Sequence, residues 1–343
     1  MSEVGANSSG LTQTAGAEFD GQTILVTGVT GFIGSHLAER LSTLGARVRG
    51  LARSAGKGDW LSKRGIKVVE GNLADASSLR HAVGGCDLVF SVAGWVGDPH
   101  TYEAARRVSV DGTRTLIEAA VDAGARRLVH TSSIAAYGPV AGGIVDETWP
   151  LRATDAYGAS KAQSESVVFS HIGQIEVSVI RPAQIYGPRG GTWTRGFAKM
   201  IHRGIPILID GGRGTFHPCY VDNLVDAYLL AATRPEAIGE AFTIVDGVTT
   251  WREFVGYYAR MLGRPARSVP AWLVRIGAGL MEVSAALTRR PPIGTPDMLK
   301  FVLGTSRYSN DKARHLLGWS PHVSLDEGMR RTEAWLRETG RLT

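Results

Sequence analysis

The sequence predicts an α/β protein in which a doubly wound parallel sheet is joined to a smaller, mostly helical C-terminal cap. From Gln22 onward, short apolar runs alternate with amphipathic stretches, which is typical of strands connected by covering helices. This alternation stops after Pro188, and the remainder is punctuated by Gly and Pro residues. A chain of 343 residues is long enough to form both parts.

The apolar runs and the stretches between them give the elements in chain order. Strands are expected at residues 23–28, 47–53, 66–72, 86–94, 126–133, 176–187 and 240–247. Helices are expected at residues 32–45, 77–85, 101–123 and 155–171. The first helix should end at Gly45, because glycine readily adopts the left-handed conformation that closes a helix.

The two parts of the protein interleave along the chain. Residues 1–20 are rich in Gly, Ser, Ala and Thr and are interpreted as a flexible tail without the features of a signal peptide. The sheet domain is expected to comprise residues 21–187 and 215–248. The substrate-binding cap is expected to comprise residues 188–214 and 249–343.

Composition argues against several classes of protein. Lys and Arg exceed Asp and Glu by 38 − 32 = +6, but the arginines are scattered, so a nucleic-acid partner is not expected. No run of eighteen apolar residues occurs, so no transmembrane helix is expected. Cys86 and Cys219 have no partner at metal-ligand spacing, which indicates free thiols, no metal site and a reducing, cytoplasmic location.

The first predicted strand runs into TGVTGFIG, where glycines are spaced as G-x-x-G-x-x-G. Glycines let the backbone approach a pyrophosphate, and the following helix offers free N–H groups and the positive end of its dipole. Tight packing without a ligand would also favour glycine here. Because the motif lies between the first strand and the first helix, we predict a Rossmann-type NAD(P) site. The predicted contacts are Gly28, Thr30, Gly31, Phe32, Ile33 and Gly34.

The end of the second predicted strand indicates which dinucleotide binds. An acidic residue there would hold the ribose 2′-hydroxyl of NAD. The stretch instead reads LARS, with Ala52 followed by Arg53 and no acid before Asp59. A guanidinium suits a 2′-phosphate, so the prediction is NADP or NAD with NADP favoured, the alternative being a surface arginine without this role. Asn72 and Leu73 are predicted to lie beside the adenine.

Two further stretches carry the predicted chemistry. The pentapeptide YGASK places Tyr157 and Lys161 one turn apart on a helix, where they are either surface residues or a functional pair. A lysine beside a phenol favours the phenolate, which lets tyrosine exchange a proton near neutral pH. Ser133, in HTSSIAAYG, is expected to meet Tyr157, because the ends of parallel strands converge on one crevice. The neighbouring Ser132 is interpreted as structural.

Together with TGVTGFIG and RPAQIYGP (181–188), these stretches resemble the extended branch of the short-chain dehydrogenase/reductase superfamily. The resemblance covers about residues 22–335 and implies hydride transfer between a nicotinamide and a carbonyl or hydroxyl carbon, with Tyr157 as acid/base. It assigns Lys161 to the nicotinamide ribose and to lowering the tyrosine pKa, and Ser133 to the reacting oxygen. Dimers are common in the family, so a homodimer is expected. The further cofactor contacts that it implies are Ala93, Gly94, Thr131 and Pro182.

One position departs from the family's pattern. Family members often have asparagine in a V-N-V-x-G-T stretch, but this chain reads VSVDGT with Ser109. The asparagine helps to hold the active-site architecture, so no catalytic role is expected for Ser109.

The C-terminal part resembles the 3β-hydroxysteroid dehydrogenase-like branch. Residues 269–292 predict an amphipathic, largely apolar helix, which would line a pocket for a lipid or polycyclic ketone, pack on the cap or lie on a membrane surface. The predicted function is therefore an oxidoreductase that interconverts steroid- or lipid-like ketones and secondary alcohols. Its predicted substrate contacts are Trp95, Gln184, Tyr186 and His217.

A nucleotide-sugar 4-epimerase or dehydratase with tightly bound NAD is the alternative. Such enzymes often have Asn at the position of Gln184 and Arg at that of Phe216, although Arg213 lies nearby as a substitute cation. A dehydratase typically has an acidic pair where Ile134 and Ala135 stand, so an epimerase is the better form of this alternative. A third hypothesis is a binding protein that senses the cofactor. The presence of Ser133, Tyr157 and Lys161 argues against it, because such proteins usually lack the tyrosine or the lysine.

Overall fold

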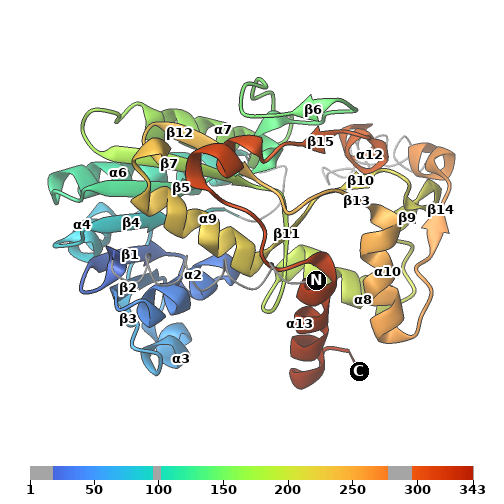
Figure 1. Ribbon diagram of the computed structural model, residues 1–343, viewed down its shortest axis with the longest axis horizontal. Helices are drawn as coiled ribbons and strands as arrows, with labels where there is room; N and C mark the ends of the chain where they lie inside the picture. The colour runs from blue at the N-terminus through green and yellow to red at the C-terminus, as the bar shows by residue number, and fades with distance from the viewer. Residues whose placement is uncertain (1–17, 96–101, 277–295, 343) are drawn as a thin grey trace, which may run out of the picture.

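The computed structural model describes residues 18–95, 102–276 and 296–342. Within them, seven strands form one parallel sheet in the order β12-β7-β5-β4-β1-β2-β3 (Figure 1). Because this order reverses between β1 and β4, the sheet is doubly wound, as predicted, with a switch point where cofactors bind. The strands are β1 (Thr23–Thr27), β2 (Arg47–Ala52), β3 (Lys67–Glu70), β4 (Leu88–Ser91), β5 (Arg127–Thr131), β7 (Glu176–Pro182) and β12 (Glu240–Ile244).

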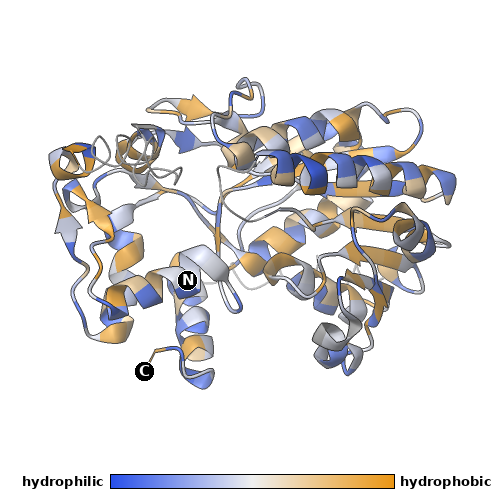
Figure 2. Ribbon diagram, turned by 180° about the vertical axis from the view of Figure 1, so that it is seen from behind, coloured by the Kyte–Doolittle hydropathy of each residue, from blue (hydrophilic) through white to orange (hydrophobic). Residues whose placement is uncertain are grey.

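Helices cover both faces of the sheet. On one face, α2 (Phe32–Thr43) contacts α9 (Val221–Thr233), and α3 (Asp59–Ser62) lies beside β3 (Figure 1). The other face carries α4 (Ala76–Val83), α6 (Gly112–Asp122) and α7 (Ala156–Phe169). Hydrophobic residues gather in the central strands and on the helix faces that meet them (Figure 2).

Three elements differ from the predicted ones. Helix α9 was not expected, because it is buried on several sides and lacks a one-sided apolar pattern. The helix predicted from residue 101, which is outside the described residues, is interrupted by a π-helical turn, η2 (Arg106–Asp111), between α5 (Tyr102–Ala105) and α6. The predicted strand at 176–187 is split at Ala183 into β7 and β8 (Gln184–Tyr186).

The cap lies beside the sheet (Figure 1). Its helices are α8 (Phe197–His202), α10 (Trp251–Leu262), α12 (Pro296–Leu303) and α13 (Leu325–Glu338). Short strands pair around it: β6 (Ile144–Val145) with β15 (Arg307–Tyr308), β8 with β11 (Pro218–Tyr220), β9 (Leu208–Ile209) with β14 (Ser268–Val269), and β10 (Thr215–Phe216) with β13 (Thr249–Thr250). Of the helix predicted at 269–292, residues 271–276 are helical and residues 277–292 lie outside the described residues.

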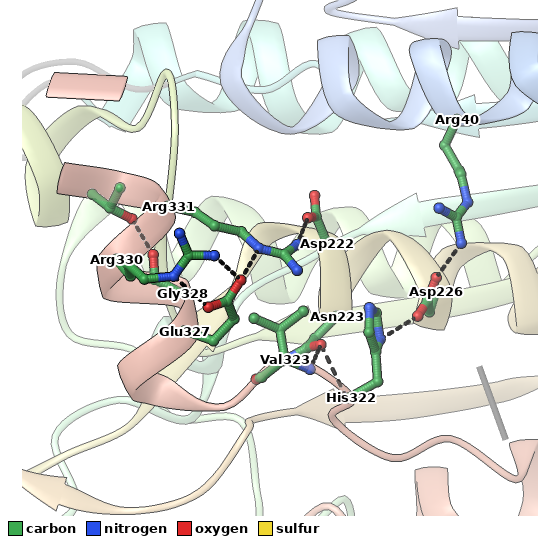
Figure 3. A network of polar contacts seen from close by, with 11 residues as sticks. Arg40, Asp222, Asn223, Asp226, His322, Val323, Glu327, Gly328, Arg330 and Arg331 are labelled. Atoms are coloured by element: carbon green, nitrogen blue, oxygen red, sulfur yellow. Dashed lines mark hydrogen bonds and ion pairs between the residues drawn. The ribbon is translucent and has the colours of Figure 1, made fainter. Parts of the chain in front are cut away.

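The C-terminal segment connects the cap to the sheet domain. Trp319 is buried in the same hydrophobic cluster as the strands, and its Nε1 donates a hydrogen bond to the Asn223 carbonyl (2.8 Å). The Asn223 side chain accepts from the N–H groups of His322 (3.2 Å) and Val323 (2.9 Å), as Figure 3 shows. The exact division between the two domains stays a prediction. Among the described residues, no helix combines the length and apolar character needed to cross a membrane.

Candidate active site

The glycine-rich loop follows β1 and leads directly into α2. Gly28 has a φ of +67°, in the left-handed region that favours glycine. A Cβ atom on Gly34 would lie 2.4 Å from the Gly28 carbonyl oxygen, so the helix can begin against the loop only with glycine there. The N-cap residue Gly31 provides no side-chain cap, which leaves the first N–H groups of α2 for a ligand.

One hydroxyl joins this loop to the end of β4. Thr27 Oγ1 accepts hydrogen bonds from the N–H groups of Val92 and Ala93, each at 2.9 Å. A Cβ atom on Gly28 would lie 3.0 Å from Ala93 Cα. The structure therefore brings Ala93, which precedes Gly94, next to the glycine loop. In this loop Thr30 is exposed, and Phe32 and Ile33 are half-buried.

The residues predicted to meet the adenosine end lie after β2 and β3. Arg53 is exposed directly beyond the last residue of β2, and it has no ion-pair partner among the described residues. Asn72 is exposed, and its Oδ1 accepts a hydrogen bond from the N–H of Ala74 (3.0 Å). Leu73 is buried against Gly112, where a Cβ atom would lie 2.8 Å from that of Leu73.

Ser109 has an architectural role that the sequence did not reveal. It is buried in the π-helical turn η2, and its Oγ accepts a hydrogen bond from the N–H of Trp95 (3.1 Å). The serine at the family's asparagine position thus fixes the chain just beyond β4. π-helical turns are rare and often occur at functional sites.

Tyr157 and Ser133 meet, as predicted. Tyr157 lies in the first turn of α7, whose N-cap Asp155 accepts a hydrogen bond from the N–H of Gly158 (2.8 Å). Ser133 follows β5 and caps the short 3-10 helix η3 (Ile134–Tyr137). Burial raises the pKa of Tyr157, while a hydrogen bond from Ser133 opposes this effect. The direction is opposite to the lowering expected from Lys161, because burial outweighs the polar contacts.

Lys161 is buried next to the same residues. Its Nζ donates a hydrogen bond to the Thr131 carbonyl oxygen at the end of β5 (2.7 Å) and lies 5.9 Å from the centre of the Tyr157 ring. Burial lowers the pKa of Lys161 to about 8, and the charge of Glu165 opposes this shift. A Cβ atom on Gly94 would lie 2.9 Å from Nζ, so the amine approaches the end of β4 closely.

The predicted substrate contacts occupy different environments. Trp95 is half-buried, whereas Gln184, Tyr186 and His217 are at most 3% exposed. The His217 ring bonds to the Ser306 carbonyl oxygen (2.9 Å), and burial lowers its pKa to about 4. Gln184 Oε1 accepts from the N–H of His217 (3.1 Å), whereas its Nε2 and the Tyr186 hydroxyl are buried without a partner among the described residues.

Phe216, at the position where nucleotide-sugar enzymes often have arginine, lies in an aromatic cluster. It is fully buried and stacks on Phe254 with 4.0 Å between ring centres. Trp251 meets its edge at 4.9 Å and Trp193 at 5.7 Å. Arg213, the suggested substitute cation, is exposed.

An internal ion pair near the site was also missed by the sequence analysis. Glu165 and Arg181 are both buried and form a salt bridge between α7 and β7 (2.6 Å). The available signal was the position of Glu165, four residues after Lys161, together with the arginine of RPAQIYGP. His130, buried between Ser91 and Ser164, was missed because nothing in its sequence context marks it.

The site fits a dinucleotide. The glycine loop leaves backbone N–H groups for a pyrophosphate, and the positive end of the α2 dipole favours that anion. Thr131 and Pro182 end neighbouring strands, and the N–H following Pro182, that of Ala183, bonds to the Ile244 carbonyl oxygen (3.0 Å). The ends of β1, β4, β5 and β7 thus converge on one edge of the sheet.

Comparison with known proteins defines the family. The sequence pattern of the NAD dependent epimerase/dehydratase family matches residues 24–245. The chain belongs to this family. It is an NAD(P)-dependent enzyme of the extended short-chain dehydrogenase/reductase group.

Three curated relatives illustrate the range of similar proteins. A 2-alkyl-3-oxoalkanoate reductase from Stenotrophomonas maltophilia is 32% identical over 91% of this chain and 98% of its own length. A UDP-glucose 4-epimerase from Mycolicibacterium smegmatis is 30% identical over 91% and 98%. A 3beta-hydroxysteroid-dehydrogenase/decarboxylase (isoform 2) from Arabidopsis thaliana is 27% identical over 90% of this chain, which spans 61% of that relative.

Solved structures confirm the fold. An epimerase, Mth375, from Methanothermobacter thermautotrophicus superposes with a TM-score of 0.79 over 97% of each chain, at 23% identity.

Proposed function

We propose that the protein interconverts a hydrophobic, steroid- or lipid-like ketone and the corresponding secondary alcohol. The observation that carries this proposal is Phe216, buried in the aromatic cluster where a nucleotide-sugar enzyme often has a cation. A diphosphate needs fixed cationic donors. An aromatic side chain at that position favours an apolar substrate instead.

Tyr157 is the proposed acid/base. When bound, the reduced nicotinamide supplies a hydride to the carbonyl carbon of the substrate. Tyr157 Oη gives its proton to the carbonyl oxygen in reduction and takes it back in oxidation. Ser133, which bonds to the same phenol, would hold that oxygen, and Lys161 would bind the nicotinamide ribose.

The proposed cofactor site extends from the glycine loop to the ends of β5 and β7. Arg53, exposed beyond β2, favours NADP through its 2′-phosphate, because a guanidinium binds phosphate oxygens with charge-assisted hydrogen bonds. Asn72 and Leu73 would flank the adenine. The remaining proposed cofactor contacts are Gly28, Thr30, Gly31, Phe32, Ile33, Gly34, Ala93, Gly94, Thr131 and Pro182.

The names of two relatives support a hydrophobic substrate. One is called a 2-alkyl-3-oxoalkanoate reductase and another a 3beta-hydroxysteroid-dehydrogenase/decarboxylase. Trp95 is the proposed substrate contact that is accessible in the structure. For the buried Gln184, Tyr186 and His217, substrate contact stays a prediction.

A nucleotide-sugar 4-epimerase with tightly bound NAD is the second candidate function. The relative from Mycolicibacterium smegmatis, named UDP-glucose 4-epimerase, is nearly as similar as the reductase. The unpaired Gln184 Nε2 is a buried donor at the position where the related enzymes have asparagine. Because of both observations, the thermal-shift screen described below includes nucleotide-sugar ligands.

Assembly and location are further proposals. A homodimer is inferred from the family, and a cytoplasmic location from the free buried thiols of Cys86 and Cys219. The exposed side chains of Trp272, Leu273 and Ile276 support peripheral contact of the cap with a membrane surface.

A thermal-shift screen of the purified protein tests the choice between the two functions. NADPH and NADH should each raise the melting temperature, because each binds only the folded state. UDP and UDP-glucose should leave it unchanged if the diphosphate anchors are missing. A clear shift with UDP or UDP-glucose would contradict the interpretation of Phe216 and favour the epimerase.

A further inference from the structure

A buried ion pair lies one helical turn behind Lys161. Glu165 follows Lys161 by four residues on α7, so both lie on the same face of the helix. Arg181 donates three hydrogen bonds to the carboxylate, from Nε to Oε1 (3.0 Å), from Nε to Oε2 (3.2 Å) and from Nη2 to Oε2 (2.6 Å). Glu165 is 1% exposed and Arg181 5%. Such a fork geometry fixes the orientation of the carboxylate.

The other side of the guanidinium is fixed as well. Arg181 Nη1 donates a hydrogen bond to Tyr137 Oη (3.0 Å). Tyr137 Oη in turn bonds to Thr243 Oγ1 on β12 (2.8 Å). The ion pair is therefore held by α7, by two neighbouring strands and by the 3-10 helix after β5, so the Glu165 carboxylate is fixed in place.

Among the described residues, Glu165 is the charged group that acts on the pKa of Lys161. Its Nζ bonds to the Thr131 carbonyl oxygen and lies near the ring of Tyr157. His130, the nearby titratable group on β5, bonds to Ser91 (3.1 Å) and Ser164 (2.9 Å), and burial followed by the charge of Lys161 holds its pKa well below the ordinary value. Because a buried charge is costly without an opposite charge nearby, the ammonium group needs Glu165.

We propose that Glu165 is a positioning residue for the reaction at Tyr157: fixed by Arg181, its carboxylate keeps the buried Lys161 ammonium charged and directed at Thr131. The role in turnover rests on the proposed function. An uncharged lysine would no longer favour the Tyr157 phenolate and would hold ribose hydroxyls less strongly.

The direct test is an NMR titration of lysine labelled with ¹³C at Cε. The chain contains seven lysines, so the resonances are few, and Lys161→Met identifies the one that matters. In the unaltered protein, Lys161 should titrate near pH 8. In Glu165→Gln its titration should move down by about one pH unit or more, because an opposite charge is lost and Arg181 now repels the amine.

Two further variants distinguish the loss of the Glu165 charge from a general loss of packing. Glu165→Gln/Arg181→Met removes both charges, so it should recover thermal stability relative to Glu165→Gln while the Lys161 titration stays low. If Glu165→Gln fails to fold, the Lys161 titration can still be measured in this double variant. Glu176→Gln is the matched control, because it breaks the Arg127–Glu176 pair (2.7 Å) at the other end of β5 and should leave Lys161 unchanged. An unchanged Lys161 titration in both Glu165 variants would overturn the proposal.

Turnover provides a second readout. With a ketone substrate, the alkaline limb of the pH–rate profile should move down in Glu165→Gln along with the Lys161 titration. If no ketone is turned over by any variant, the proposed function fails, but the titration still decides whether Glu165 controls Lys161. A Lys161 titration that moves while the pH–rate profile stays fixed would contradict the role in the reaction.

Discussion

The carboxyl edge of the sheet and the aromatic cluster of the cap are built from opposite kinds of residues. The sheet edge has a glycine loop with free N–H groups, the hydroxyls of Ser133 and Tyr157, and the buried Lys161. The cap cluster consists of packed rings around Phe216, with stacking and edge contacts between 4.0 and 5.7 Å. We propose that the first region holds an anion and moves a proton, whereas the second is packed with apolar rings that leave no place for a charge.

This difference indicates that the reaction and the choice of substrate depend on different parts of the molecule. The reaction depends on short segments at strand ends, whose residues must have particular chemistry. The substrate depends on how the cap packs, where many apolar sequences would serve equally well. We therefore expect the turnover rate to change when a single atom is removed from the first region. We expect the preference for an apolar substrate to change when a charge is introduced into the second region.

The largest effect is expected from Tyr157→Phe, which removes one oxygen from the polar region. Turnover should fall by about 10²–10⁴-fold, because general acid–base catalysis is lost. Cofactor affinity, measured by fluorescence titration with NADPH, should change little. Tyr102→Phe is the control. It removes a hydroxyl of α5 that donates a hydrogen bond to Gln163 of α7, the helix that carries Tyr157 (2.7 Å). Normal turnover in Tyr157→Phe would exclude this residue from the mechanism.

A glycine substitution tests the cradle for the cofactor. Gly34→Ala would place Cβ 2.4 Å from the Gly28 carbonyl oxygen, so the loop or the helix must shift. We expect NADPH affinity to fall by about tenfold or more, since such strain costs about 1–3 kcal/mol. Gly247→Ala serves as the control, because nothing lies within 4 Å of a Cβ atom there. Equal NADPH affinity in both variants would remove the loop from the proposed site.

Cofactor preference should depend on one cation. Arg53→Ala should weaken NADP binding by about 10-fold to 100-fold through the loss of a charge-assisted hydrogen bond, while NAD binding stays nearly constant. Isothermal titration with both dinucleotides measures the difference. Arg47→Ala removes an equal charge at the opposite end of β2 and should affect neither. Equal losses for NADP and NAD would argue against contact with the 2′-phosphate.

The smallest effect is expected where the C-terminal segment contacts the helices that cover the sheet. His322 Nδ1 lies 2.8 Å from Asp226 Oδ2, and Arg40 approaches the other oxygen at 3.5 Å (Figure 3). The Asp226 carboxylate raises the pKa of His322. A raised pKa in the folded state means that this stabilisation is complete below the ordinary value of 6.5 and is lost as pH rises through the raised value.

His322→Asn should therefore lower the melting temperature slightly at pH 6 and have no effect at high pH. The shift should be about 1 °C, because the pair is partly exposed and screened by solvent. His202→Asn, at an exposed histidine of α8, is the control. A constant difference between the variant and the parent protein at every pH would indicate lost packing instead of lost charge.

Most of the sheet and the meeting of the proposed reacting residues could be predicted from the sequence, because they lie in motifs with fixed spacing. Tyr157 and Lys161 are separated by one helical turn, and Ser133 follows β5, whose carboxyl end lies at the same edge. Helix α9 could not be predicted, since burial on several sides removes the usual one-sided pattern.

The missed parts of the site depend on contacts between distant residues. Glu165 and Arg181 pair across α7 and β7, and their positions in the two motifs do not show by themselves that the side chains meet. The raised pKa of Tyr157 follows from burial, which the sequence does not give. Tyr186 and His217 lie near the predicted strand ends, but only the structure shows that they are packed inside.

We propose that a cap built around Phe216 selects a hydrophobic ketone rather than a nucleotide sugar. The most direct measurement compares two rates for the same purified enzyme: oxidation of NADPH with steroid and 2-alkyl-3-oxo ketones, and interconversion of UDP-glucose and UDP-galactose with NAD. We expect NADPH oxidation that depends on the ketone, and no interconversion of the sugars. Interconversion of the UDP-sugars without ketone reduction would contradict it.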